Sequence, residues 1–128
     1  MDIQYLQNVL VALRGYVKTH RDLASRFMKG FVEGVAHFKR NKEDSLKILM
    51  KKMRIEKGKE TYLERSYGLY ATQYIESAPY PSVAGTRTVL EFMAKDFPKA
   101  KTADPNSFID NSLIKPLEDS GFIKGLYR

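Results

Sequence analysis

Two histidines and a few isolated acids are the side chains of this sequence best suited to acid–base chemistry or metal binding. His20 and His37 lie 17 residues apart, so a helix that carries both cannot bring them to one metal ion. Glu33 and Glu64 fall on different predicted helices, and sequence spacing does not pair them. We expect His20 to be exposed and His37 to flank an apolar helix face.

Other catalytic patterns are missing from the sequence. Cysteine is absent, which excludes disulfides, thiolate metal sites and a cysteine nucleophile. No serine lies in a nucleophile elbow. The segments GFVEG and AGTR lack the strand–turn–helix context of a phosphate loop. We therefore predict that the chain is not an enzyme and that it needs no metal and no cofactor.

Positive charge is concentrated in one region. The chain carries a net charge of +7, and residues 39–59 supply +6 of it, from nine basic and three acidic residues. Such a patch can attract phosphate or nucleic acid. However, it has no interleaved aromatic residues and no nucleic-acid motif, so we interpret it as a solvated helix face and expect no nucleic-acid partner. The patch comprises Lys39, Arg40, Lys42, Lys47, Lys51, Lys52 and Arg54.

The hydrophobic pattern predicts a mainly α-helical fold, a bundle of four to five helices in a single domain of residues 1–128. The clearest apolar stripe runs along residues 19–40 at helical spacing. The predicted helices start at or near Thr19, Asn41, Lys59, Ser82 and Asn111 or Ser112, and Asp104 caps a further short turn. Prolines at 79, 81 and 98 and Gly121 end these elements.

The N-terminal segment, residues 3–17, fits two structures. Its run VLVAL, Val9 to Leu13, is continuous and apolar, as in a buried parallel strand. The same segment also has helical spacing, although Gly15 would weaken a long helix. Periodicity leaves both alternatives open. The residues with helical spacing are Ile3, Leu6, Leu10, Leu13 and Val17.

No segment predicts insertion into a membrane. The apolar runs are shorter than a bilayer-spanning helix requires. The first 18 residues lack a basic segment before their apolar patch and a small-residue cleavage site after it. For the chain as written we therefore expect a cytoplasmic location.

Three motifs follow one another in a characteristic order. FxxGxxxxKxNKE occupies residues 31–43, YPSxxGxxTVL occupies residues 80–90, and DPxxFIDxSxxxxLxxSGFI occupies residues 104–123. In this order they resemble the C-terminal part of periplasmic solute-binding proteins of ABC transporters. The group concerned is similar to nitrate-, taurine-, alkanesulfonate- and thiamine-pyrimidine-precursor-binding proteins. The resemblance covers essentially the whole chain.

The resemblance implies part of a two-lobe α/β fold that holds a small organic ligand in the cleft between its lobes. This chain matches the returning, mostly helical part, so the resemblance implies an incomplete cleft. If VLVAL is the returning strand, the residues at its end lie nearest to the hinge or cleft. Candidate ligand contacts are therefore Leu13, Arg14 and Gly15.

Two functional hypotheses follow. The first is a non-catalytic fragment or descendant of a solute-binding protein for small-molecule uptake. The second is a stand-alone oligomeric helical protein that binds a partner or a small ligand. Helices without a sheet to cover must bury their apolar stripes against one another or another chain, so we expect a homo-oligomer.

Overall fold

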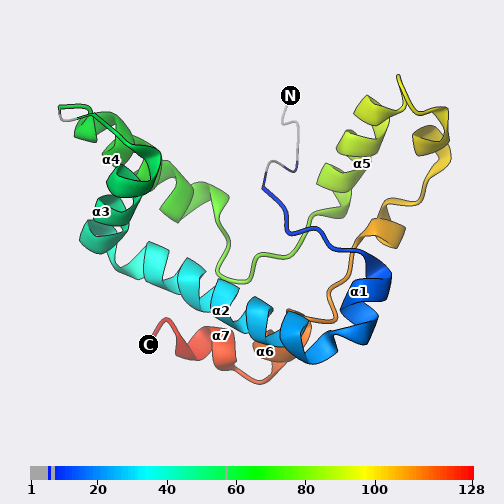
Figure 1. Cartoon of the computed structure of the whole chain (residues 1–128), viewed down its shortest axis with the longest axis horizontal. Coiled ribbons are helices and arrows are strands. Elements are labelled where there is room, and N and C mark those ends of the chain that lie inside the picture. The colour runs from blue at the N-terminus through cyan, green and yellow to red at the C-terminus, as the bar shows by residue number, and fades with distance from the viewer. Residues whose placement is uncertain (1–5, 7, 57) are drawn as a thin grey trace.

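The structure, a computed structural model, describes residues 6, 8–56 and 58–128 (Figure 1). Within these ranges no residue lies in a β-strand. The prediction of a mainly helical chain is therefore confirmed. The α-helices are α1 (Arg14–Thr19), α2 (Arg21–Arg40), α3 (Lys42–Met53), α4 (Glu60–Leu69), α5 (Val83–Met93), α6 (Lys115–Asp119) and α7 (Phe122–Gly125). A π-helical turn, η1 (Tyr70–Tyr74), extends α4, and 3-10 turns η2 (Pro98–Thr102) and η3 (Pro105–Phe108) follow α5.

The helices form an open arch around α2, the longest element (Figure 1). Helices α3 and α4 rise from the C-terminal end of α2 as one arm. Helix α5 stands in the other arm and packs mainly on η2 and η3. The short helices α6 and α7 lie along α2 at the base of the arch. The two arms therefore depend on α2 and the C-terminal segment for their positions.

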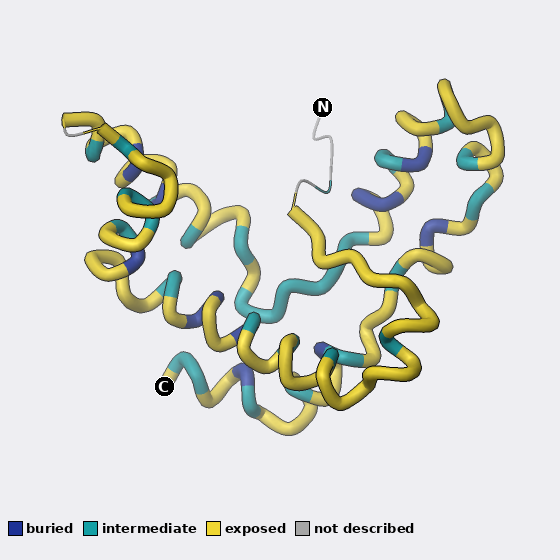
Figure 2. Tube along the Cα trace, in the orientation of Figure 1, coloured by how far each residue is buried: buried dark blue, intermediate teal, exposed yellow. Residues whose placement is uncertain are grey.

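The largest core lies between α2 and the C-terminal helices. Its fully buried members are Val32, Ile114 and Ile123, which are 0%, 2% and 5% exposed. Met28 and Phe31 of α2 pack against it, as do residues of α6 and α7. Figure 2 shows buried residues as short, separated stretches along the trace. The core thus joins the base of the arch and leaves much of both arms uncovered.

The predicted start of the long helix at Thr19 is wrong. Thr19 ends α1, and His20 (φ −119°, ψ 41°) breaks the chain direction before α2 begins. The Thr19 hydroxyl donates back to the carbonyl of Gly15 at 3.0 Å and does not cap α2. His20 is exposed, as expected, and its ring stacks on Tyr16 with centroids 4.3 Å apart. This local bonding separates α1 from α2 and moves the start of the long helix from Thr19 to Arg21.

Neither alternative for residues 3–17 holds over the whole range. Helix α1 covers Arg14 to Val17, whereas residues 9–13 lie in neither a helix nor a sheet. We call residues 9–13 the extended segment, after its last residue Leu13, which has φ −67° and ψ 133°. Residues 3–5 lie outside the described part of the chain. Leu6 lies against α5, where a Cβ added at Gly85 would be 3.0 Å from the Leu6 Cγ. The extended segment is thus anchored at α5 on one side and at α1 on the other.

Two of the predicted caps are confirmed by side-chain hydrogen bonds. The Ser82 hydroxyl accepts from the Gly85 amide at 3.1 Å and starts α5. The Asp104 carboxylate accepts from the Asn106 amide at 3.0 Å and starts η3. Both bonds are local, so the sequence pattern was sufficient to predict them.

Two other predicted helix ends differ in detail. Asn41 separates α2 from α3 as expected, but its side chain bonds back to His37 and caps no amide of α3. Near the C-terminus, α6 begins at Lys115 with Ile114 as its N-cap and no side-chain cap, so the helix starts later than the predicted cap at Asn111 or Ser112. The Asp110 carboxylate accepts from the Ser112 amide at 2.9 Å in the turn before it. Gly121 adopts φ 75° and lies after the end of α6, as predicted, and the short helix α7 follows it where only an apolar tail was expected. This left-handed conformation favours glycine.

Candidate functional site

The candidate ligand contacts Leu13, Arg14 and Gly15 lie where the extended segment meets α1. The Leu13 side chain is 81% exposed. The Arg14 guanidinium donates to the Ser107 carbonyl at 2.6 Å, so it ties α1 to the η3 turn. Among the residues that the structure describes, none outside its own helix and chain neighbours lies within 4 Å of a Cβ built on Gly15. The structure thus places these residues together on the surface, with Arg14 engaged by main chain.

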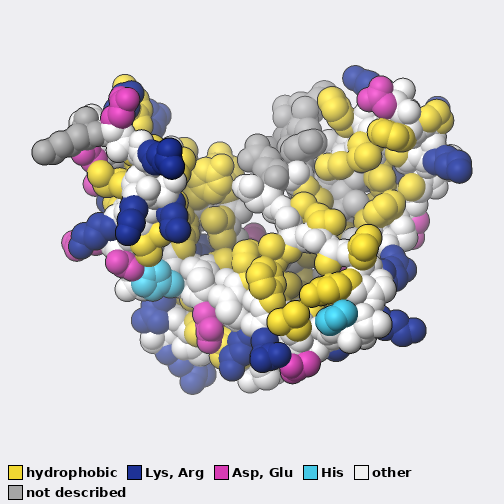
Figure 3. Space-filling view, viewed as in Figure 1, with side chains coloured by type: hydrophobic (Ala, Val, Ile, Leu, Met, Phe, Trp, Pro, Cys, Tyr) yellow, Lys and Arg dark blue, Asp and Glu magenta, His cyan; other side chains and the backbone are white. Residues whose placement is uncertain are grey.

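The basic patch divides into two groups. Lys39 donates to the Ile75 carbonyl at 2.5 Å, and Arg40 donates to the carbonyls of Leu126 and Arg128 at 2.5 and 3.0 Å. These two residues therefore hold other segments of the chain against α2. The rest of the patch is exposed on α3 and its C-cap, in the arm where Figure 3 shows Lys and Arg side chains clustered. It consists of Lys42, Lys47, Lys51, Lys52 and Arg54.

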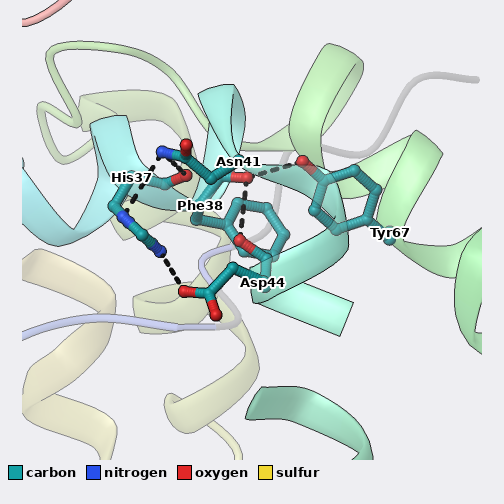
Figure 4. A network of polar contacts seen from close by, with 6 residues as sticks. His37, Phe38, Asn41, Asp44 and Tyr67 are labelled. Atoms are coloured by element: carbon teal, nitrogen blue, oxygen red, sulfur yellow. Dashed lines mark hydrogen bonds and ion pairs between the residues drawn. The ribbon is translucent and has the colours of Figure 1, made fainter. Parts of the chain in front are cut away.

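A polar network fixes the joint between α2 and α3 (Figure 4). The His37 Nε2 lies 2.8 Å from an Asp44 oxygen. The Asn41 amide donates to the His37 carbonyl at 3.2 Å. The Tyr67 hydroxyl of α4 donates to the Phe38 carbonyl at 2.6 Å. The Tyr67 bond satisfies the Phe38 carbonyl in the last turn of α2, whereas the His37 carbonyl also accepts from the Asn41 main-chain amide at 2.9 Å.

The His37 and Asp44 side chains of the joint are open to solvent. His37 and Asp44 form a pair with side chains 48% and 57% exposed. Exposed pairs of this kind contribute little to stability and are not shielded from water. Two shallow depressions, of about 370 and 200 Å³, are both lined in part by Arg40 and Asn41. Within the described ranges, no three His, Asp or Glu side chains are grouped so as to hold a metal ion.

A second polar contact joins the middle of the chain to its C-terminal helices. The Tyr80 hydroxyl donates to a Glu118 carboxylate oxygen at 2.7 Å. This hydrogen bond, with burial and the charge of Glu118, raises the pKa of Tyr80 from 10.0 to about 12. The contact binds the segment before α5 to α6.

We expect this contact to give a pH-dependent contribution to stability. A pKa raised on folding means that the folded chain holds the tyrosine proton more tightly than the unfolded chain does. The contribution is therefore complete below pH 10 and is lost as pH rises through about 12. Urea unfolding of the wild type and of Tyr80→Phe measures it, with Tyr62→Phe as the exposed control. An equal alkaline loss in wild type and Tyr80→Phe would contradict the assignment.

Apolar side chains remain uncovered along much of the arch. The stripe of α2 illustrates this, because Val35 is buried while Leu23 and Phe27 are 48% and 59% exposed. We call the exposed apolar side chains of residues 9–27 the N-terminal apolar face. In Figure 3, hydrophobic side chains gather in the lower middle of the arch, next to a histidine. This face comprises Val9, Leu10, Val11, Leu13, Tyr16, Leu23 and Phe27. Other exposed apolar side chains include Met53, Tyr62 and Tyr74 in one arm and Phe92, Phe97 and Phe108 in the other.

The total surface indicates how much is left uncovered. The chain exposes 10254 Å². A compact monomer of 14.7 kDa exposes about 6,900 Å². The difference is about 3,300 Å², more than a standard interface between two proteins buries in total. A surface of this size and apolar character is typical of a chain that packs against another polypeptide.

The long-range contacts made by basic side chains could not be predicted from the sequence. Arg21 of α2 donates to the hydroxyl and the carbonyl of Ser112, at 2.9 and 2.6 Å. Like Arg14 and Arg40, it binds main chain about 90 residues away. Main-chain carbonyls are present at every position, so no sequence pattern identifies these acceptors.

No protein-family model, curated protein or solved structure matches this chain. Within the described residues, none of the helices has the length and apolar character required to cross a bilayer.

Proposed function

We propose that this chain is a non-catalytic part of a small-molecule-binding protein, similar to the returning helical part of periplasmic solute-binding proteins. The observation that carries the proposal is the extended segment at residues 9–13. It is apolar, it is exposed, and no described residue pairs with it in a sheet. A strand whose neighbours belong to another polypeptide has this form.

The positions of the motifs in the fold also support this proposal. FxxGxxxxKxNKE spans the joint between α2 and α3, where Lys39 and Asn41 both bond to main chain. YPSxxGxxTVL contains the Ser82 cap, and its Gly85 is the point where Leu6 approaches α5. These motif residues therefore stabilise the joint between α2 and α3 and the start of α5. Such a role fits a part of a receptor that supports the fold while the other lobe supplies most of the ligand contacts.

The role of the chain in this proposal is to cover and complete a sheet. The apolar sides of α1 and α2 would pack on strands that the rest of the receptor provides, as helices do on a buried parallel sheet. Ligand binding in the cleft would then depend on both parts. The intact protein would work in the periplasm in small-molecule uptake, and Leu13, Arg14 and Gly15 would lie near its hinge.

Complex formation with the missing part tests this proposal. The chain would be refolded with the N-terminal portion of a taurine-binding member of the family, and in parallel with those of nitrate- and thiamine-precursor-binding members. We expect a 1:1 complex with at least one of them, and a higher melting temperature when the matching ligand is added.

Val11→Lys places a charge in the strand that would be buried, so it should prevent the complex, whereas Tyr62→Lys on exposed α4 should not. The proposal is contradicted if the chain is stably folded by itself and binds none of the three portions.

A further inference from the structure

We propose that, by itself, this chain forms a two-fold symmetric dimer in which residues 9–13 of two copies pair as antiparallel strands centred on Val11. The inference rests on one premise of the proposed function, namely that this segment is a strand without its neighbours. It goes further by naming a second copy of the chain as the polypeptide that covers the N-terminal apolar face.

The first observation is the state of the segment itself. No main-chain hydrogen bond joins residues 9–12 to another described residue. Val11 and Leu13 are 84% and 81% exposed. An extended segment with free main-chain groups and apolar, partly β-branched side chains is a ready template for another strand. Leu6 against Gly85 and Arg14 against Ser107 anchor the chain on both sides of the segment, so little conformational entropy is lost when it pairs.

The second observation is the pattern of exposure along the segment. Side chains at positions 9, 11 and 13 lie on one face of a strand, and those at 10 and 12 lie on the other. Val9 and Leu10 are about half exposed, whereas Val11 and Leu13 are almost fully exposed. Antiparallel pairing centred on Val11 sets Val9 opposite Leu13 of the second copy, and Val11 opposite itself. Every cross-strand pair on that face is then apolar, which stabilises a sheet.

The third observation is the area that must be covered. The chain exposes 10254 Å², about 3,300 Å² more than a compact chain of its mass. Obligate homodimers bury about 2,000 to 5,000 Å² in total, which is about 1,000 to 2,500 Å² from each chain, so a second copy can cover a large part of this excess. The dimer would bury Tyr16, Leu23 and Phe27 of α1 and α2 beside the paired strands. A second copy is therefore large enough to cover the face, and a two-fold axis makes the same face serve both chains.

Charge does not prevent this arrangement, although each copy carries +7. Five of the basic residues that contribute to this charge lie on α3 and its C-cap, away from residues 9–27. Within residues 9–27, Arg26 is paired with Asp22 at 2.9 Å, and Arg14 and Arg21 lie close enough to Asp110 to lower its pKa. Lys18 is a further exposed cation of α1. The remaining repulsion acts across solvent and is screened by salt. We therefore expect added salt to leave the dimer intact or to strengthen it.

Light scattering during size-exclusion chromatography of the full chain tests the proposal. The expected mass is twice 14.7 kDa. Val11→Lys sets two like charges opposite each other on the axis and should raise the dimer dissociation constant by about 100-fold or more. Tyr62→Lys changes a side chain that is 77% exposed on α4, outside the face, and should leave the mass unchanged.

Oxidation of a single introduced thiol tests the register. The chain has no cysteine, so Val11→Cys carries one thiol per copy. Directly opposed residues in antiparallel strands have Cα atoms about 4.5 to 5.5 Å apart, which a disulfide can bridge. We expect Val11→Cys to cross-link rapidly into a covalent dimer, and Tyr62→Cys to remain largely uncross-linked under the same conditions.

The outcomes separate this inference from the proposed function. A dimer that Val11→Lys dissociates and Val11→Cys cross-links supports the inference. A monomer, or a dimer that neither variant affects, overturns it. If a monomer then forms a complex with an N-terminal receptor portion, the proposed function survives without the dimer. If a stably folded monomer binds none of these portions, both fail.

Discussion

Replacing Ile114 with alanine is expected to lower the free energy of unfolding by about 2–5 kcal/mol. Ile114 is 2% exposed and packs with Val32 and Ile123 between α2 and the C-terminal helices. Truncation removes buried methyl groups and leaves a cavity that the neighbouring helices fill only in part. Because a small domain has about 5–15 kcal/mol of stability in total, this change would leave the chain marginally folded.

Urea unfolding followed by circular dichroism, at one protein concentration for all variants, measures this loss. Phe108→Ala is the matched control, because this large apolar side chain is 64% exposed on the η3 turn. Its truncation should change stability by no more than about 0.5 kcal/mol. Equal losses for the two variants would show that the core between α2 and the C-terminal helices does not hold the arch together.

This core matters because the side-chain hydrogen bonds between α2 and the C-terminal segment lie at exposed positions. Arg21 and Arg40 of α2 bind carbonyls of Ser112, Leu126 and Arg128. These bonds orient the C-terminal segment along α2, but they lie at exposed positions, where competition with water limits their net contribution. Burial of Val32, Ile114 and Ile123 therefore provides most of the stabilisation at the base, and the bonds fix the alignment.

Local patterns in the sequence predicted the helices and several of their ends, because those features depend on neighbouring residues. The caps at Ser82 and Asp104 each involve an amide two or three residues further along the chain. The break at His20 was missed because Thr19 bonds backward into α1 when a forward capping bond was expected. A Thr side chain can do either, and sequence spacing does not distinguish the two directions.

The apolar stripe of α2 predicted which face is hydrophobic, but it could not predict what covers that face. Val35 is buried, whereas Leu23 and Phe27 on the same stripe are about half exposed. Periodicity reports the pattern of side chains along one helix. Whether another element covers them depends on contacts between distant segments or between chains. The same reason explains why VLVAL has the composition of a buried strand and yet lies exposed here.

Tyr67 is an aromatic side chain that joins the arm formed by α3 and α4 to the end of α2. This residue is 6% exposed, and its ring lies 4.8 Å from the ring of Phe38, measured between centroids. Its hydroxyl donates to the Phe38 carbonyl at 2.6 Å. Tyr67 thus connects α4 to the end of α2 through both packing and a hydrogen bond, and the two contributions can be separated by mutation.

We expect Tyr67→Ala to lower the free energy of unfolding by about 3–5 kcal/mol, because it removes a buried aromatic ring. Tyr67→Phe keeps the ring and removes only the hydroxyl, so its expected loss is about 0.5–1.5 kcal/mol. Tyr62→Ala on the same helix, at a side chain that is 77% exposed, should change stability by no more than about 0.5 kcal/mol.

Urea unfolding of the three variants gives the comparison. Similar losses for Tyr67→Ala and Tyr67→Phe would mean that the ring contributes nothing by packing against Phe38. The arm with the exposed lysines of α3 would then be held to α2 by its polar joint alone.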